Sequence, residues 1–205
     1  MNPAHQHPIL AVNALGLTST SLTIKDLFNA GVHVAPRAEL ELTNSYRQVI
    51  PYVVFTRGDE VLLYSRTKQG GEAKLFDKCS IGFGGHIDQE VMEFDVNTLD
   101  GFRSAIVTSM HRELVEEVYP GITKDQCIWA AAASQARGLL LLDTNPEDRH
   151  VGILCTIEVT DEELTNCTGD HSIENRHWVK LDTLLENEAY PGLELWSRVA
   201  VQTLS

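Results

Sequence analysis

The sequence predicts an α+β fold, because strand-type and helix-type patterns occupy different stretches of the chain. Residues 46–66 are rich in β-branched and aromatic side chains and contain a turn at Arg57–Glu60, which predicts a β-hairpin. Further along, apolar residues recur at steps of four, as in one buried face of a helix: Ile106, Met110, Leu114 and Val118. The stretch Leu193–Leu204 has the pattern of a terminal amphipathic helix.

The length and charge of the chain limit its organisation and its partners. With 205 residues, 43% of them hydrophobic, it is expected to form one core domain at 46–205, with residues 1–45 as an N-terminal extension packed on it. Its 29 acidic and 16 basic residues give a net charge of −13, which argues against a nucleic-acid polymer as partner. A small phosphorylated substrate remains compatible with this charge, because a bound divalent cation reverses the local sign.

Cysteine usage and the N-terminal sequence predict a cytoplasmic protein. Cys79, Cys127, Cys155 and Cys167 are widely spaced and include no Cys-x-x-Cys pair, so they indicate neither a zinc ribbon nor a disulfide framework. The N-terminus lacks the basic region of a signal peptide, and no apolar stretch reaches the length of a membrane span. No membrane partner is therefore expected, and the sequence leaves a homodimer open.

The chemistry is expected on the helix that carries the apolar stripe. Glu113, Glu116 and Glu117 fall within roughly one third of its circumference, and carboxylates so close together resist joint ionisation without a cation. Oxygen ligands of this kind suit Mg²⁺ or Mn²⁺. Arg112 can pair with Glu116 one turn along the helix. The alternative is a solvated acidic face, which is the usual role of such residues on a helix.

The order Arg112-Glu113-Leu114-Val115-Glu116-Glu117, preceded by Gly82-Phe83-Gly84-Gly85-His86, resembles the signature of the Nudix hydrolases. The resemblance implies an α/β/α sandwich, with a mixed β-sheet between the motif helix and the C-terminal helices. It also implies divalent-metal-dependent hydrolysis of a diphosphate bond in a small nucleoside-diphosphate-linked or similar substrate. Glu113, Glu116, Glu117 and the Gly84 carbonyl would be the Mg²⁺ or Mn²⁺ ligands, with Arg112 beside them.

The chain departs from the signature between the glycine turn and the helix. Arg112 lies 28 residues after Gly84, twice the spacing of the family pattern, which places an insertion at about 88–101. The family pattern has a glutamate eight positions before the arginine, but this chain has Ser104 there. Glu90 instead lies at the distance from Gly84 that the pattern gives for this glutamate. A branch of predicted Nudix-type phosphoesterases is similar to this chain, including the lengthened loop after Gly85-His86-Ile87. The apolar residues within the insertion predict that part of it packs on the domain or on a partner chain.

Further site residues are expected around this centre. Arg66 and Lys78 are candidates for binding substrate phosphate, and His86 for contacting the substrate. The general base is left open among the motif glutamates and three acids outside the motif, which are Glu147, Asp148 and Glu158. Trp178 is expected in the core.

The remaining pattern predicts the following elements: a strand at Ile9–Val12, a short helix capped by Thr20 or Ser21 and ending at Asn29, a turn or short helix at Arg37–Leu42, a strand within Ala130–Leu142, a strand at His150–Val159 and a helix at Leu181–Glu188.

Two other functions remain open. An isopentenyl-diphosphate-isomerase-like enzyme shares the fold but needs a catalytic cysteine, for which Cys79 is the candidate. A catalytically silent Nudix domain that senses a ligand would tolerate the altered Gly-x5-Glu segment and Tyr119-Pro120 in place of the closing Gly-aliphatic pair.

Overall fold

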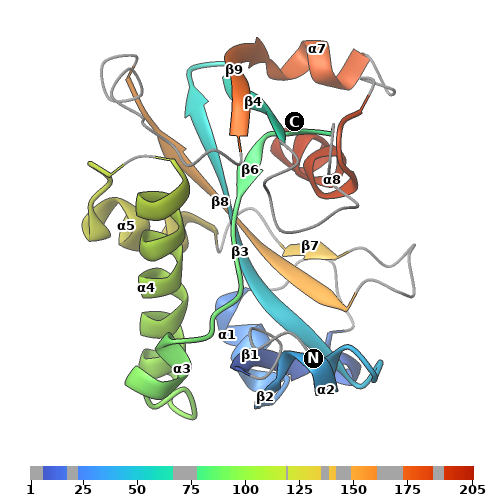
Figure 1. Ribbon diagram of the computed structural model, residues 1–205, viewed down its shortest axis with the longest axis vertical. Helices are drawn as coiled ribbons and strands as arrows, with labels where there is room; N and C mark the ends of the chain where they lie inside the picture. The colour runs from blue at the N-terminus through green and yellow to red at the C-terminus, as the bar shows by residue number, and fades with distance from the viewer. Residues whose placement is uncertain are drawn as a thin grey trace.

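A computed structural model describes residues 7–17, 23–66, 78–118, 120–134, 139–141, 149–160, 173–186 and 192–205 (Figure 1). The strands are β1 (Pro8–Asn13), β2 (Val32–Pro36), β3 (Tyr46–Arg57), β4 (Glu60–Arg66), β5 (Cys79–Ser80), β6 (Gly82–Phe83), β7 (Leu139–Leu141), β8 (His150–Glu158) and β9 (Ile173–Lys180). The helices are η2 (Ala14–Gly16, a 3₁₀ turn), α1 (Ile24–Asn29), α2 (Arg37–Leu40), α3 (Glu90–Glu93), α4 (Leu99–Glu117), α5 (Lys124–Ser134), α7 (Leu181–Glu186) and α8 (Leu195–Leu204).

The strands form a mixed sheet organised around β3. Its main path runs β2-β1-β3-β4-β5, while β6 and β8 also pair with β3, β7 pairs with β8 and β9 pairs with β4. The β3–β8 pair is parallel, and the other strand pairs described are antiparallel. The predicted hairpin is confirmed, since β3 and β4 meet at the turn before Glu60.

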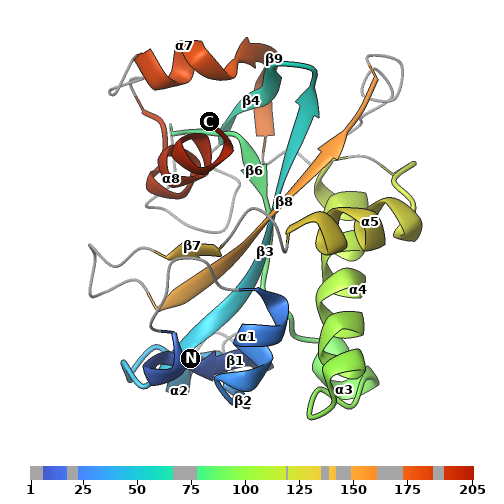
Figure 2. The same ribbon diagram turned by 180° about the vertical axis from the view of Figure 1, so that it is seen from behind.

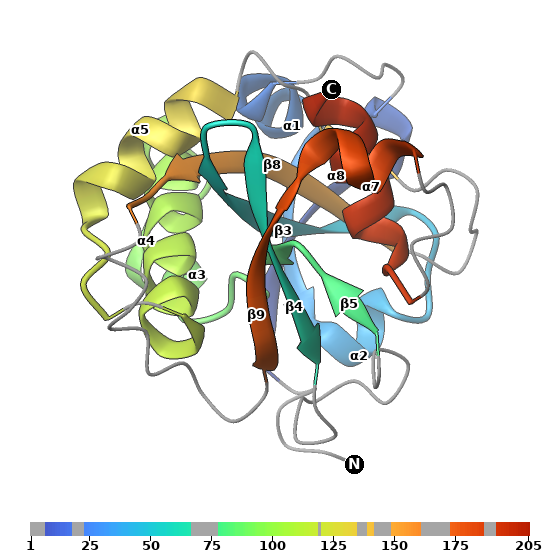
Figure 3. The same cartoon turned by 90° about the horizontal axis from the view of Figure 1, so that it is seen from above.

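Helices cover both faces of the sheet, as the α/β/α prediction requires. Seen from above, α4 and α5 lie on one side of β3 and β8, and α7 and α8 lie on the other (Figure 3). The interior of β3 is buried on both faces, which explains its dense apolar sequence. Val49, Val53 and Phe55 face the α4 side, whereas Tyr52 and Val54 belong to a second cluster beneath α8.

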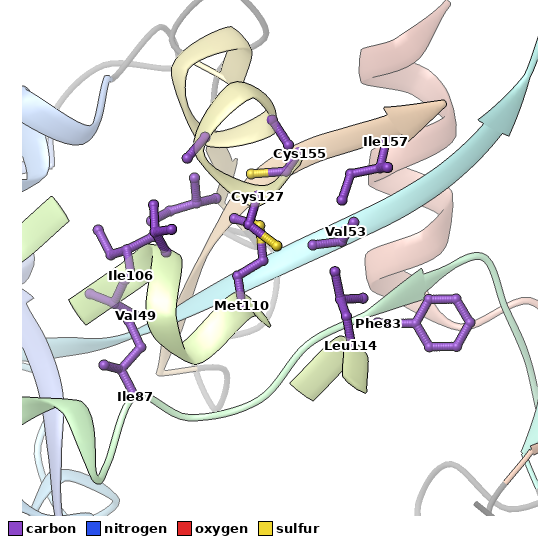
Figure 4. Packing of buried hydrophobic residues seen from close by; sticks show 14 of the residues in the cluster. Val49, Val53, Phe83, Ile87, Ile106, Met110, Leu114, Cys127, Cys155 and Ile157 are labelled. Carbon is purple, nitrogen blue, oxygen red and sulfur yellow. The ribbon is translucent and has the colours of Figure 1, made fainter. Parts of the chain in front are cut away.

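The larger core lies between α4, α5 and the sheet. The apolar stripe of α4 is buried as predicted, with Ile106, Met110 and Leu114 directed towards β3 and β8 (Figure 4). Cys127 joins this core from α5, which lies beside α4 in both side views (Figures 1 and 2). This packing fixes which side of α4 is left for its glutamates.

Residues at the N-terminal end continue the same sheet. β1 pairs with both β2 and β3, so its backbone hydrogen bonds join the extension to the domain. α1 ends at Asn29 as predicted but is capped by Thr23, whose side chain accepts from the Asp26 amide while the Asp26 carboxylate accepts from Thr23. Thr20 and Ser21 lie outside the described residues.

The strand expected within Ala130–Leu142 is wrong for its first part and confirmed near its end. Residues 130–134 are the last part of α5 (Lys124–Ser134), and Leu139–Leu141 forms β7, whereas 135–138 and Leu142 lie outside the described residues. The run of four alanines from Ala130 has high helix propensity, and Ala130 and Ala131 bury their side chains in the core beside α4. Tertiary packing of that small-residue face stabilises the helix.

The insertion is only partly a loop. α3 lies in its first half. Its last residues, from Leu99 to Gly101, are the first turn of α4, where the Thr98 hydroxyl accepts from the Gly101 amide. Val96 is buried in the core, with Val91 and Phe94 packed against it, which confirms that part of the insertion packs on the domain. Met92 is exposed.

Candidate active site

The glycine turn after β6 lies directly against the motif helix. A side chain on Gly85 would overlap the carboxyl group of Glu113, so only glycine allows the turn and the acid to approach this closely. A side chain on Gly84 would overlap the carbonyl oxygen of Pro51 in β3. These two close approaches place the backbone of the turn beside the acidic end of α4.

Arg112 is the centre of an ion-pair network on α4. Its Nε donates to Glu90 Oε1 at 3.0 Å, its Nη2 to Asp88 Oδ1 at 3.1 Å and its Nη1 to Glu113 Oε1 at 2.7 Å. Glu116 Oε2 is more distant, 3.7 Å from Nη1, so the helical pair predicted with Glu116 is the weakest contact of the four. Of the two motif glutamates that it contacts, the guanidinium therefore orients Glu113 rather than Glu116.

Glu90 reaches this network from α3, within the insertion. Its side chain is 2% exposed, and its Oε2 has no hydrogen-bond partner within the described part of the chain. Taking a carboxylate out of water is costly unless a cation accompanies it, and Arg112 supplies that charge. The structure thus places Glu90 against the motif arginine, and Ser104 is not needed there.

The environment of Glu113 disfavours its charged form. Burial raises its pKa above the ordinary value, and the charge and hydrogen bond of Arg112 lower it only in part. Its side chain is 14% exposed, and Oε1 is held by Arg112. A cation bound at Oε2 would stabilise the negatively charged form of Glu113, which burial disfavours.

The side chains of the motif helix provide suitable oxygen donors for a metal ion, but they do not surround one point as a complete set of protein ligands would. Glu116 is 60% exposed and Glu117 is half-buried, on the same turn of α4 as Glu113. Among the residues described, no three His, Cys, Asp or Glu side chains converge on one point. Mg²⁺ is commonly bound by one or two carboxylates together with water and substrate phosphate, which this acidic turn can supply. The donor set therefore fits Mg²⁺ or Mn²⁺.

His86 contacts two different parts of the domain. Its carbonyl oxygen accepts from Arg112 Nη2 at 3.2 Å, whereas its Nε2 lies 2.7 Å from Gln48 Oε1. The ring of His150 is 5.6 Å from that of His86, centroid to centroid. The backbone of His86 thus belongs to the acidic network and its side chain to the neighbouring strands β3 and β8.

The roles proposed for the other candidate site residues stay predictions. Lys78 is exposed before β5, and Glu158 is exposed at the end of β8. Arg66 ends β4, where it is paired in register with Ile173, and its side chain lies outside the described part. Glu147 and Asp148 also fall outside the described residues.

Two residues bear on the alternatives considered for the sequence. Cys79 packs against the apolar cluster beneath α8, whereas Glu113 contacts the turn beside α4, so the arrangement does not favour an isomerase. Trp178 packs against the core as predicted, with the Arg57 guanidinium 4.6 Å above its ring.

Asp88 was missed as a partner of Arg112. Its position two residues before Glu90 was the only sequence signal. A second group that the sequence did not indicate is the buried polar cluster of Tyr52, Ser80, Glu194 and Ser197, which come from three segments far apart in the chain.

A mixed sheet between two helical layers, with a glycine turn against an Arg-Glu-x-x-Glu-Glu helix, defines a Nudix-type domain. No protein-family model matches the sequence. The chain is 32% identical over 172 residues to protein YmaB of Bacillus subtilis, covering 82% of this chain and 76% of that protein. The chain therefore belongs to the same family as YmaB, and its fold is that of the Nudix hydrolases.

Solved structures share the fold. Tm1382, assigned to the Nudix hydrolases, superposes with a TM-score of 0.63 at 21% identity, over 96% of this chain and 97% of that one. A bifunctional NMN adenylyltransferase/ADP ribose pyrophosphatase from Francisella tularensis, complexed with AMP and a manganese ion, gives a TM-score of 0.50 at 17% identity. That match covers 77% of this chain and 41% of the Francisella chain. None of the described helices could cross a membrane.

Proposed function

We propose that this protein is a divalent-metal-dependent pyrophosphohydrolase that cleaves a diphosphate bond in a small, nucleoside-diphosphate-linked or similar substrate. The observation that carries the proposal is the placement of the Glu113 carboxyl group between Arg112 and the Gly85 backbone, one turn before two further acids. The bifunctional Francisella protein, which includes an ADP ribose pyrophosphatase and binds AMP and manganese, supports the same class of reaction.

The cation would be held by Glu113, Glu116 and Glu117, with the Gly84 carbonyl as a further oxygen donor. When bound, Mg²⁺ or Mn²⁺ supplies charge neutralisation at the phosphates and a more acidic water. The protein would act in the cytoplasm on a small phosphorylated molecule, with no nucleic-acid polymer or membrane as partner, and it could do so as a monomer or a homodimer.

Other residues would orient the metal ligands, bind the substrate and accept the proton of the attacking water. Arg112 fixes the direction of the Glu113 carboxylate. Burial alone would lower the pKa of Arg112, but its hydrogen bond with Glu90 and the charges of Glu113, Glu90 and Asp88 raise it, so the guanidinium stays charged. Substrate phosphates would meet cationic or hydrogen-bonding groups at the entrance, for which Arg66, Lys78 and His86 are the candidates. The water's proton would pass to a motif glutamate or to one of Glu147, Asp148 and Glu158.

The test is a panel of nucleoside and sugar diphosphates assayed for monophosphate or phosphate release with and without Mg²⁺ or Mn²⁺. Turnover that needs the metal and is lost in Glu117→Gln, but not in Glu186→Gln, is the expected result, because Glu186 is an exposed acid on α7 away from the motif helix. Metal should also raise the melting temperature of the wild type, since it binds the native state preferentially, and Glu117→Gln should remove that shift. No metal-dependent release from any compound, together with no metal-dependent shift, would refute the proposal.

A catalytically silent, ligand-sensing domain is the second candidate. The exposure of Glu116 and the altered Gly-x5-Glu segment, which has Ser104 at the position of the family glutamate, favour it. Nucleotide binding by calorimetry without turnover under the same conditions would support this function instead.

A further inference from the structure

A buried polar cluster joins the C-terminal helix to the sheet. Tyr52, Ser80, Glu194 and Ser197 are each 5% exposed or less. Glu194 Oε1 accepts from the Tyr52 hydroxyl at 3.1 Å, from Ser197 Oγ at 3.2 Å and, at short range, from Ser80 Oγ. The Tyr52 hydroxyl also lies 2.8 Å from Ser197 Oγ. The cluster lies at the start of α8, on the sheet face opposite α4.

This cluster also holds the backbone that enters the glycine turn. The Ile81 amide donates to Ser197 Oγ at 3.0 Å. The Gly82 carbonyl accepts from the Tyr64 hydroxyl at 2.6 Å, and Ser80 Oγ, whose proton goes to Glu194, lies 3.1 Å from the same carbonyl oxygen. Just before them, the Glu194 amide donates to the Cys79 carbonyl at 2.9 Å, so the segment leading into α8 pairs with β5 as a strand does.

The residue that leaves the turn is connected to the same helix through packed rings. The His86 and His150 ring centroids are 5.6 Å apart, and those of His150 and Trp196 are 6.2 Å apart. The Trp196 ring in turn lies 5.5 Å from that of Tyr52. The start of α8 is therefore linked to both ends of the segment 80–86.

Gly84 and Gly85 lie between these two ends, and Gly85 abuts the Glu113 carboxyl group. We propose that Glu194 is a positioning residue, through which α8 sets the distance between the glycine turn and the acids of α4. This inference rests on the proposed function, because it assigns Glu194 to the reaction at that site. Glu194 and Ser197 lie on the sheet face opposite α4, so both act through the backbone of 80–82.

A polar cluster suits this purpose better than apolar packing. A buried carboxylate is costly unless every contact is made, so the cluster favours one relative placement of α8 and the turn. Apolar packing specifies position less strictly, because cores tolerate repacking of hydrophobic side chains of similar total volume. Burial, and then the charge of Glu194, raise the pKa of Tyr52 well above its usual value, so its hydroxyl remains a donor to the carboxylate.

The test compares Glu194→Ala with Glu194→Gln and with Val201→Ala. The glutamine variant would keep an oxygen acceptor for the three hydroxyls, whereas the alanine variant removes it. Val201 is buried on the same helix and has an apolar side chain, so its truncation removes packing but no hydrogen bond and serves as a matched destabilising control. Urea unfolding measures the stability of each variant. Hydrogen exchange of the amides of 81–87 then reports the order of the turn without requiring catalysis.

Faster exchange at 81–87 in Glu194→Ala than in Val201→Ala at matched stability is the expected result, with near-native exchange in Glu194→Gln. In the assay, kcat should fall by up to about a hundredfold with KM little changed, as for a misplacement of about 1 Å at a reacting centre. If Glu194→Ala does not fold, Ser197→Ala replaces it, because it removes the acceptor of the Ile81 amide while leaving the Glu194 carboxylate in place.

The two proposals can fail separately. Equal exchange in Glu194→Ala and the matched control, or no recovery in Glu194→Gln, would overturn the positioning role whatever the activity. If the wild type releases no phosphate while Glu194→Ala still loosens 81–87 selectively, the hydrolase proposal fails and the control of the turn by α8 stands.

Discussion

Glu90 Oε1 accepts a hydrogen bond from Arg112 Nε at 3.0 Å, although 22 residues separate them in the chain. The ion pair attaches the insertion to the motif helix. It places an acidic side chain beside the motif arginine, although the family position for that acid is occupied by Ser104 in this chain. It also joins two elements that the sequence leaves far apart, α3 and the last turns of α4.

The first prediction concerns this ion pair. Glu90→Ala should lower the free energy of unfolding by about 3 kcal/mol, because removing one partner leaves a partly buried charge with less compensation. Breaking a buried ion pair costs about 3–5 kcal/mol in general. The loss here should be at the lower end, because Asp88 and Glu113 still contact Arg112. Urea unfolding measures it, and the exposed Glu93→Ala on the same helix should change stability by less than about 0.5 kcal/mol. Equal effects of the two substitutions would show that the pair is not structurally important.

Turnover measurements test a second role of Glu90, which is to serve as the motif acid. Glu90→Gln keeps an acceptor for Arg112 Nε but removes the charge, so it should alter turnover more than stability if Glu90 serves as the motif acid. Unchanged turnover in Glu90→Gln would leave it a purely structural partner.

The close approach of Gly85 to Glu113 gives the next prediction. Gly85→Ala should cost about 1–3 kcal/mol through overpacking and should weaken metal-dependent stabilisation, since the new methyl group displaces the carboxylate. In the background of Glu113→Ala the same substitution should cost much less, because the overlapping group is gone. A double-mutant cycle by chemical denaturation measures this coupling, and strict additivity would contradict the contact.

The packing of the insertion is tested at two of its apolar positions. Val96→Ala should destabilise the protein by about 1–3 kcal/mol through lost burial and a residual cavity, because Val96 lies in the core beside α4. Met92→Ser should be close to neutral, since Met92 is 78% exposed. A similar melting temperature for both variants and the wild type would mean that the insertion does not support the domain.

Cys127 should make stability depend on pH at the alkaline end. Burial raises the pKa of its thiol to about 11, only partly opposed by Lys124. In the unfolded chain the thiol loses its proton at about 8.5 while the folded state retains it, so stability should fall as pH rises from about 8.5 towards 11. Cys127→Ser should reduce this slope in urea unfolding measured across that range. Alkylation of the native protein at pH 8 should correspondingly modify Cys127 more slowly than the half-buried Cys79.

The sequence by itself was sufficient where the signal was local. The spacing of Ile106, Met110 and Leu114 identified the buried face of α4, because a helix repeats its faces within a few residues. The same periodicity placed Glu113, Glu116 and Glu117 on one turn, and the β-branched and aromatic run of 46–66 indicated the hairpin of β3 and β4. The spacing from Gly84 singled out Glu90.

The tertiary structure decided what depends on contacts between distant segments. The alanine run of α5 is helical because its small residues pack on the core beside α4. The leucine run at 139–142, just beyond α5, favoured a strand in the sequence and so hid this helix. The parallel pairing of β3 with β8 joins Gln48 to His150, and only long-range backbone hydrogen bonds set that register. The cluster of Glu194 with Tyr52 likewise spans 142 residues, and polar residues so far apart carry no shared sequence signal. Their burial in one place is a property of the folded chain, because each is stable there only when the others satisfy its hydrogen bonds.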